Sequence, residues 1–256
     1  MNPTPFDLSA FRLNSPLGKR ILAVTREGDY AHPGEEEAIR LTLAPFAGKA
    51  GRRWLDAGCG RGGTAHFVAQ QGWAEVTAFD IDAVSVAEAR ERFPDVSFHA
   101  CAVADAPRVV PGKFDLVYAF NAFYAFPDQP GALRALRELA ADDATLVLFD
   151  YTDKGGFAET EFARLAEATH WGPLVENVLR DWLANAGWQL ESVTNLDADY
   201  DRWYAWLVSR FDTRREELLT FAPPEAVAHA RHVYAAMLDA IRAGALGGGI
   251  FAARAI

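Results

Sequence analysis

The stretch Asp56-Ala57-Gly58-Cys59-Gly60-Arg61-Gly62, called the glycine loop below, combines a carboxylate with glycines at alternate positions. An apolar lead-in before it predicts a buried strand, and the residues from Thr64 onward predict a helix. Glycine lets the backbone approach a ligand closely, and the start of the helix offers unpaired amide donors. Because Asp56 would repel a pyrophosphate, the loop favours a nucleoside whose tail carries a cationic amine or sulfonium.

A second carboxylate ends the next apolar run. Asp80 follows the run 76–79 and lies 20 residues after Gly60 (80 − 60). In a βαβ unit this position lies beside the glycine loop, where a carboxylate can accept the hydroxyl protons of a ribose. Asp82 is predicted instead to cap the helix 83–92.

The glycine loop resembles the first motif of the class I S-adenosylmethionine-dependent methyltransferases, (Asp/Glu)-x-Gly-x-Gly-x-Gly, at every defined position. Phe114-Asp115-Leu116-Val117 is similar to the fourth-strand pattern of that family, and the resemblance covers about residues 30–195 and the final strand. It implies S-adenosylmethionine as the cofactor and S-adenosylhomocysteine as the product. The cofactor-binding residues that it implies are Asp56, Ala57, Gly58, Cys59, Gly60, Gly62, Asp80, Ile81, Ala102, Val103, Asp105 and Phe120.

The chain departs from the family pattern after its third predicted strand. These enzymes usually place there an aspartate that binds the adenine amino group, but this chain has Ala102 near that position. Asp105 comes three residues later (105 − 102). We therefore expect the backbone around Ala102 and Val103 to contact the adenine, with Asp105 as an aid.

Tyr30-Ala31-His32-Pro33-Gly34-Glu35, called the approach segment, precedes the first helix of the predicted domain. It resembles the His-x-Gly segment that closes over the cofactor in the glycine, sarcosine and dimethylglycine N-methyltransferases. By this resemblance His32 is a catalytic candidate, as a base or a hydrogen-bond partner, and Tyr30 a substrate candidate. The alternative for His32 is a packed or capping side chain beside the Pro-Gly turn.

Aromatic residues follow the fourth predicted strand in Phe120-Asn121-Ala122-Phe123-Tyr124-Ala125-Phe126. Methyltransferases place acceptor-facing residues here, so Asn121 and Phe123 are substrate candidates and Tyr124 a catalytic candidate. Aromatic faces suit a cationic or methylated amine, although the same side chains could instead pack the lid against the sheet. Asn121-x-x-Tyr124 resembles the Asn-Pro-Pro-Tyr motif of amino-group methyltransferases, but both prolines are missing.

The sequence of residues 200–246, called the lid, predicts two helices. They are 200–219 and 224–243, and Pro223-Pro224 separates them. Tyr200, Trp203 and Tyr204 share one helix face by their spacing, which is typical of core residues and also of a substrate pocket. Arg202 and Arg210 are alternative clamps for a substrate carboxylate, or solvated charges. The substrate candidates in the lid are Trp203, Tyr204 and Arg202.

Helices and strands alternate elsewhere, which predicts an α/β fold: a doubly wound, seven-stranded, mostly parallel sheet with the lid inserted before the last strand. The expected strands are 53–56, 75–80, 96–100, 114–120, 144–150, 188–193 and 249–253, and the expected helices include 34–45, 64–71 and 131–140. We expect an N-terminal helical and approach segment at 1–33 and a methyltransferase domain at 34–199 and 247–256. The lid, at 200–246, would cover the carboxyl ends of the strands.

The 256 residues carry a net charge of −10, and their basic residues are scattered. Nucleic acid is therefore not an expected partner, and the charge favours a small-molecule acceptor. Two cysteines, Cys59 and Cys101, form neither a disulfide framework nor a metal site. With no apolar run long enough to span a membrane and no signal-peptide pattern, we expect a cytoplasmic monomer or homodimer without a metal.

The sequence thus predicts a methyltransferase for a small acceptor, with an amine slightly preferred over oxygen. A methyltransferase for RNA or protein is the alternative, and a catalytically silent cofactor-binding protein is a third hypothesis. An NAD-dependent oxidoreductase is disfavoured by Asp56 and by glycines that do not follow Gly-x-Gly-x-x-Gly.

Overall fold

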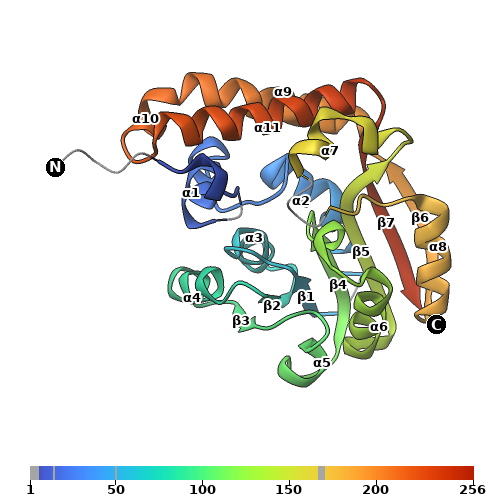
Figure 1. Cartoon of the computed structure of the whole chain (residues 1–256). Coiled ribbons are helices and arrows are strands. Elements are labelled where there is room, and N and C mark those ends of the chain that lie inside the picture. The colour runs from blue at the N-terminus through green and yellow to red at the C-terminus, as the bar shows by residue number, and fades with distance from the viewer. Residues whose placement is uncertain (1–5, 14, 50, 167–170) are drawn as a thin grey trace.

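A computed structural model describes residues 6–13, 15–49, 51–166 and 171–256. Within these residues, seven strands form one sheet in the order β3-β2-β1-β4-β5-β7-β6, and β7 runs antiparallel to β5 and β6 (Figure 1). The strands are β1 Arg53–Ala57, β2 Glu75–Asp80, β3 Ser97–Ala100, β4 Phe114–Phe120, β5 Ala140–Asp153, β6 Trp188–Asn195 and β7 Leu246–Ala255. The predicted fold class, a mostly parallel Rossmann-like methyltransferase sheet, is confirmed.

Helices cover both faces of this sheet (Figure 1). The α-helices are α1 Pro16–Thr25, α2 Glu35–Leu43, α3 Gly63–Gln70, α4 Ala83–Arg92, α5 Ala106–Val109, α6 Gln129–Leu139, α7 Glu161–Ala166, α8 Glu176–Asn185, α9 Asp197–Thr213, α10 Arg215–Leu219 and α11 Pro224–Arg242. Short 3-10 helices are η1 Leu8–Ala10, η2 Ala44–Phe46, η3 Phe123–Ala125 and η4 Phe157–Glu159. Among the described residues no helix is both long and apolar enough to cross a membrane.

The two faces of the sheet bury alternate residues of each strand, because side chains of a strand point to opposite sides in turn. In β4, Leu116 and Tyr118 belong to the cluster shared with α2, α3, α4 and the lid. Val117 and Ala119 belong to the cluster shared with α5, α6 and α8. The residues that follow β4 can therefore reach the lid side or the opposite core, depending on their position.

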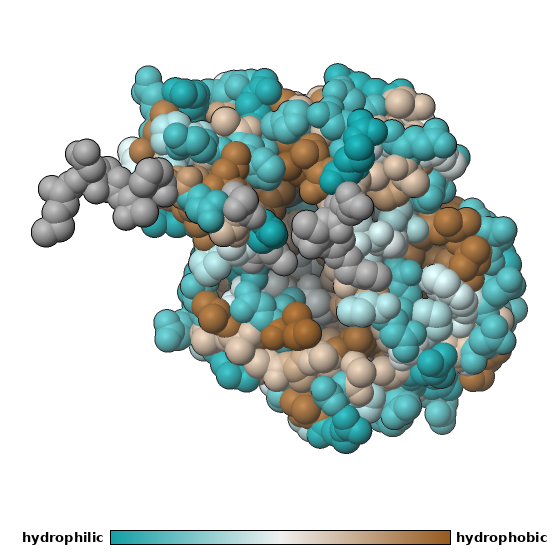
Figure 2. All heavy atoms as spheres, in the orientation of Figure 1, coloured by the Kyte–Doolittle hydropathy of each residue, from teal (hydrophilic) through white to brown (hydrophobic). Residues whose placement is uncertain are grey.

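The lid helices α9 and α11 lie side by side above α1 and α2, across the carboxyl ends of the parallel strands (Figure 1). Most of the lid surface seen in Figure 2 is hydrophilic, and hydrophobic atoms gather along its lower edge, toward the rest of the molecule. Tyr200, Trp203 and Tyr204 of α9 are all buried there. The lid therefore closes the edge of the sheet at which the glycine loop and the residues after β4 emerge.

Candidate active site

The glycine loop leaves the end of β1 and is hydrogen-bonded to the end of β2. The amides of Gly58 and Cys59 both donate to the carbonyl of Phe79, at 2.9 and 3.0 Å. Gly58, Gly60 and Gly62 all have positive φ, of 84°, 53° and 84°. A Cβ on Gly58 would come within 2.5 Å of the Ala122 Cβ. The loop therefore depends on glycine for its backbone conformation and touches the turn after β4.

Two glycines of the loop allow a matched test of this geometry. A Cβ on Gly62 would lie 2.6 Å from Cζ of the buried Phe98, whereas one on Gly60 meets its nearest neighbour only at 3.9 Å. Gly62→Ala is expected to lower the free energy of unfolding by about 3 kcal/mol, from left-handed strain and overpacking together. Gly60→Ala carries only the strain, about 1–2 kcal/mol. Urea unfolding of both variants measures the difference, and equal losses would contradict the role given to Phe98.

Asp80 ends β2 beside this loop. Its Oδ2 accepts from the amide of Gly60 at 2.8 Å, and its Oδ1 accepts from the amide of Asp82 at 2.9 Å. These bonds fix the carboxylate and leave lone pairs for two more donors, as a ribose diol requires. The next side chain, Ile81, is 76% exposed, which is unusual for isoleucine and is explained if a nucleoside base covers it. Asp82 caps α4, as predicted, by accepting from the Val84 amide at 3.1 Å.

Asp56 is almost fully buried at the end of β1, with 1% of its surface exposed. Its Oδ2 has no hydrogen-bond partner among the described residues. Burial, aided by the charge of Asp80, raises the pKa of Asp56 to about 8. The nearby Tyr118 hydroxyl of β4 opposes this rise in pKa, but it carries no charge. A buried carboxylate is costly without a counter-charge, which a cationic amine would supply. The residues present therefore fit the cofactor that the sequence predicts.

The expected adenine contacts lie in the turn after β3. The amide of Cys101 donates to the Asp80 carbonyl at 3.0 Å, which brings this turn beside the ribose position. Asp105 lies at the N-terminus of the short helix α5, and its carboxylate pairs with Arg108 in a half-exposed position. Ala102 and Val103 are partly exposed in the turn between Cys101 and α5. Their placement agrees with backbone contact to the adenine, which stays a prediction.

The approach segment is held against the start of α3, directly after the glycine loop. His32 is 1% exposed; its Nε2 lies 3.0 Å from Oγ1 of Thr64, at the start of α3, and its Nδ1 lies 3.1 Å from the Pro33 carbonyl. Burial lowers the pKa of His32 to about 3, so the ring is neutral at physiological pH. Its centroid is 4.7 Å from that of Phe120. Of the two roles predicted for His32, the environment favours the hydrogen-bond partner over the base.

Asp29, just before the approach segment, adds an ionic link. Its Oδ1 accepts from Nε of Arg61 in the glycine loop at 2.8 Å, and its other oxygen pairs with Arg92 of α4. Burial alone would raise the pKa of Asp29, but Arg92 and Arg61 hold it below its usual value. The approach segment is thereby fastened to the predicted cofactor site.

The turn after β4 contains a buried polar network. Asn121 has a left-handed backbone, with φ of 43°, and its Nδ2 donates to the Tyr200 hydroxyl at 3.1 Å. Asp150 of β5 is fully buried and accepts from the amides of Tyr124, at 3.0 Å, and Tyr151, at 2.8 Å. Burial raises the pKa of Asp150 to about 7. Asp150 was not among the predicted site residues. The only feature of the sequence that could have indicated it is its position at the end of an apolar predicted strand.

Aromatic side chains gather at this turn. The ring centroid of Trp171 lies 4.2 Å from that of Tyr124 and 4.6 Å from that of Tyr151. Tyr124 and Trp171 are partly exposed, and Tyr151 is buried. We call these three residues the aromatic wall; Trp171 and Tyr151 gave no signal in the sequence. Phe123, by contrast, is fully buried in the cluster with α5, α6 and α8, so the structure does not bring it to the wall.

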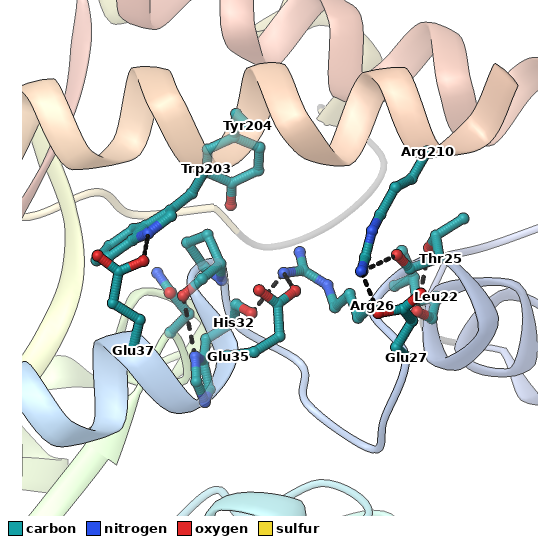
Figure 3. A network of polar contacts seen from close by, with 12 residues as sticks. Leu22, Thr25, Arg26, Glu27, His32, Glu35, Glu37, Trp203, Tyr204 and Arg210 are labelled. Atoms are coloured by element: carbon teal, nitrogen blue, oxygen red, sulfur yellow. Dashed lines mark hydrogen bonds and ion pairs between the residues drawn. The ribbon is translucent and has the colours of Figure 1, made fainter. Parts of the chain in front are cut away.

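Two substrate candidates of the lid, Trp203 and Tyr204, lie above the approach segment (Figure 3). Trp203 donates from Nε1 to Glu37 at 3.0 Å and packs where a Cβ on Gly34 would lie. The Tyr204 hydroxyl points down from α9 (Figure 3) and hydrogen-bonds the Tyr151 hydroxyl. Tyr30 packs beside His32, with centroids 5.8 Å apart. Arg202 is half-exposed and pairs with Glu37 and Asp199. Tyr204 is therefore the lid candidate that reaches the aromatic wall.

Comparison with known proteins gives a family for this arrangement. A family model described as a methyltransferase domain matches residues 30–193. The ubiquinone biosynthesis O-methyltransferase of Xanthomonas euvesicatoria pv. vesicatoria (strain 85-10) is 32% identical over 167 residues, covering 60% of this chain and 69% of that enzyme. The magnesium-protoporphyrin O-methyltransferase of Rhodobacter capsulatus is 36% identical over 161 residues, covering 59% of this chain and 68% of that enzyme.

A solved structure shows the same fold. Phosphoethanolamine N-methyltransferase 2 of Haemonchus contortus, in complex with S-adenosyl-L-methionine, matches with a TM-score of 0.85 at 17% identity, over 98% of this chain and 61% of that one. The chain thus spans less than two thirds of that enzyme's length. Together with the glycine loop, Asp80 and the unpartnered Asp56, the family match shows that this chain belongs to the class I S-adenosylmethionine-dependent methyltransferases.

Proposed function

We propose that this methyltransferase acts on a small-molecule acceptor and prefers an amine to an oxygen. The observation that carries the proposal is the aromatic wall at the ends of β4 and β5, with the buried carboxyl of Asp150 directly behind Tyr124. The faces of aromatic rings attract amines that are cationic or become so, by about 0.5–2 kcal/mol each. An amine gains positive charge as it accepts a methyl group, so such a wall favours the transition state over the neutral reactant.

The wall also has the right neighbours for transfer from the cofactor. Its turn begins at Asn121 and Ala122, and Ala122 touches the glycine loop at Gly58. Methyl transfer from a sulfonium is an in-line displacement in which the N–C bond forms as the S–C bond breaks. Alignment and exclusion of water can supply about 7–11 kcal/mol of the barrier, so no dedicated base is required. His32 would then hold the approach segment against Thr64 rather than take a proton.

An oxygen acceptor is the second candidate, and the sequence relatives favour it. The relatives described above from Xanthomonas euvesicatoria and Rhodobacter capsulatus are named O-methyltransferases, whereas the solved structure with the same fold is named an N-methyltransferase. Transfer assays with matched pairs, such as benzylamine with benzyl alcohol and sarcosine with glycolate, separate the two. Methylation of the alcohol but not of the amine in each pair would favour the oxygen acceptor.

The aromatic wall gives a mutational test of the amine preference. Trp171→Leu is expected to lower kcat/KM for the amine by about tenfold, mainly through kcat, because one cation–π contact of about 1–2 kcal/mol is lost from the transition state. Trp171→Phe keeps an aromatic face and should restore most of the activity. Steady-state kinetics with the best amine of the panel measure both variants. An equal loss of kcat/KM in both, or none in either, would speak against recognition by the ring face.

A further inference from the structure

Asp150 of β5 is a carboxylate in the core of the molecule. It lies one residue beyond Phe149, which pairs with Phe120 where β4 and β5 run side by side, and none of its surface is exposed. Burial of a carboxylate is costly unless hydrogen bonds compensate the charge. The groups that supply these hydrogen bonds therefore indicate what Asp150 does.

Both oxygens of Asp150 accept from backbone amides of the aromatic wall. Oδ2 accepts from the amide of Tyr124 at 3.0 Å, and Oδ1 accepts from the amide of Tyr151 at 2.8 Å. Nδ2 of Asn121 lies 3.5 Å from Oδ1. Among the described residues, every group that hydrogen-bonds this carboxyl is a donor. A protonated carboxyl would point its own O–H at these donors, so the arrangement fits the ionised form.

These bonds join separate segments of the chain at the aromatic wall. Tyr124 follows β4 and Tyr151 belongs to β5, and their ring centroids lie 5.1 Å apart. The segment that carries Trp171 is attached to the same point, because the amide of Gly172 donates to the Tyr124 carbonyl at 3.0 Å. The backbone of Tyr124 is therefore held by Asp150 at its N–H and by Gly172 at its carbonyl.

The hydroxyl groups that face Asp150 remain protonated. Burial, aided by the charge of Asp150, raises the pKa of Tyr124 above its usual value, and burial does the same for the pKa of Tyr151 and of Tyr200 in α9. His32, which packs on the other side of Phe120 and Phe149, is neutral. Tyr124 therefore contributes a neutral ring and hydroxyl at the wall, rather than the base considered from the sequence.

We propose that Asp150 is a positioning residue of the acceptor site, where its ionised carboxylate holds Tyr124 and Tyr151 so that the acceptor is aligned for transfer. This inference rests on the proposed place of the acceptor at the aromatic wall, but not on whether that acceptor is an amine or an alcohol. Asp150 is fully buried, so it acts through the wall. A misplacement of about 1 Å can lower a rate by about 100-fold, and the effect should therefore fall mainly on kcat.

The first test replaces the carboxylate by a group of the same shape. Asp150→Asn offers one acceptor oxygen, and its NH2 group would face a backbone N–H. With the best acceptor of the transfer assays, kcat at pH 8 is expected to fall by about 100-fold. KM and the affinity for S-adenosylhomocysteine should stay within a few-fold.

Thr152→Val is the matched control. Thr152 lies two residues further along β5, on the same face of the strand. It is buried, and its Oγ1 has no hydrogen-bond partner among the described residues. Removing that hydroxyl should change kcat by no more than about twofold. An equal loss in both variants, or a loss of cofactor affinity in Asp150→Asn as large as the loss of kcat, would mean general damage to β5 and would overturn the proposal.

The pH profile separates positioning by the charge from packing by the side chain. Burial raises the pKa of Asp150 to about 7, so its ionised fraction rises about tenfold between pH 6 and 8. The kcat of the natural protein divided by that of Asp150→Asn, both saturated with S-adenosylmethionine, should rise by about the same factor. This ratio cancels the titration of the acceptor and of other groups in the enzyme. A ratio that does not change with pH would overturn the proposal.

The natural protein gives a test that needs neither a variant nor an acceptor. If Asp150→Asn does not fold, the amide protons of Tyr124 and Tyr151 still report the ionisation of the carboxylate that they bind. Their NMR chemical shifts should move together, with a midpoint near pH 7, and constant shifts between about pH 5.5 and 8.5 would overturn the proposal. Failure of the amine preference would show separately, in the matched acceptor pairs.

Discussion

Replacing Asp80 with alanine is expected to weaken the binding of S-adenosylhomocysteine by about 100-fold or more. The carboxylate is fixed by the amides of Gly60 and Asp82 and presents its remaining lone pairs where the ribose diol would lie. Two hydrogen bonds to a charged group contribute about 1.5–3 kcal/mol each, and 1.4 kcal/mol corresponds to a tenfold change in affinity. Isothermal titration of the purified protein measures the loss.

Asp82→Ala is the matched control, because Asp82 is an acid two residues away with a different task. It caps α4 and pairs with Lys19. Removing it should lower the free energy of unfolding by about 1 kcal/mol and leave the affinity for S-adenosylhomocysteine within a few-fold. Similar affinity losses in both variants would mean that the negative charge after β2, rather than the position of Asp80, supports binding.

The elements that carry the cofactor site were predictable because their signals are local. β2 and β4 have the predicted bounds, 75–80 and 114–120, because a short apolar run between turn residues is typical of a buried strand. The order aspartate, glycines, helix and second aspartate places Asp56 and Asp80 at adjacent strand ends. Pairing of Asp56 with Ala78 in the two parallel strands confirms that placement.

The strands around the lid were predicted less well, because tertiary contacts set their ends. β5 starts at Ala140 rather than at 144, and its pairing with β4 is irregular there, between Phe114 and Leu116. β7 starts at Leu246 rather than at 249 and includes glycines that usually weaken strands. A Cβ on Gly248 would lie 2.1 Å from the Tyr200 ring, so glycine is needed where α9 packs on the strand. No local pattern contains that information.

The acceptor side could be predicted only in outline. Tyr124 and Tyr204 were identified from their motif and helix spacing, and both lie at or against the aromatic wall. Trp171 was missed, because it stands alone in a stretch without a motif.

Cofactor binding is expected to tighten by roughly 50-fold between pH 5.5 and 7.5 through the titration of Asp56. In the free protein its pKa is raised from 3.8 to about 8, so the carboxyl is mostly neutral across this range. The cationic amine of the cofactor favours the ionised form, and binding must therefore release a proton. Below the free-protein pKa this linkage changes the dissociation constant by up to tenfold per pH unit. Titration calorimetry in buffers of different ionisation enthalpy measures the proton released.

The same pKa shift predicts how the stability of the free protein depends on pH. The trend is opposite to that of a salt-bridged acid, whose contribution to stability grows as pH rises. Because the folded pKa lies above the unfolded one, the stability contributed by neutral Asp56 is fully present below about pH 4 and is lost as pH rises through 8. Asp56→Asn keeps the shape and removes the titration. The unfolding free energy of this variant, measured relative to that of the natural protein, should be higher at pH 8.5 than at pH 5.

Asp56→Asn should also bind S-adenosylhomocysteine weakly and with little dependence on pH. Asp150, whose pKa lies near 7, is present in both proteins, and His32 stays neutral throughout the range, so the difference between the two pH profiles isolates Asp56. If the affinity of this variant still depended on pH as steeply as that of the natural protein, the proton released on binding would come from another group. In that case the unpartnered Oδ2 of Asp56 would not be the counter-charge of the cofactor amine, and the preference for a cationic nucleoside would rest on the glycine loop and Asp80 alone.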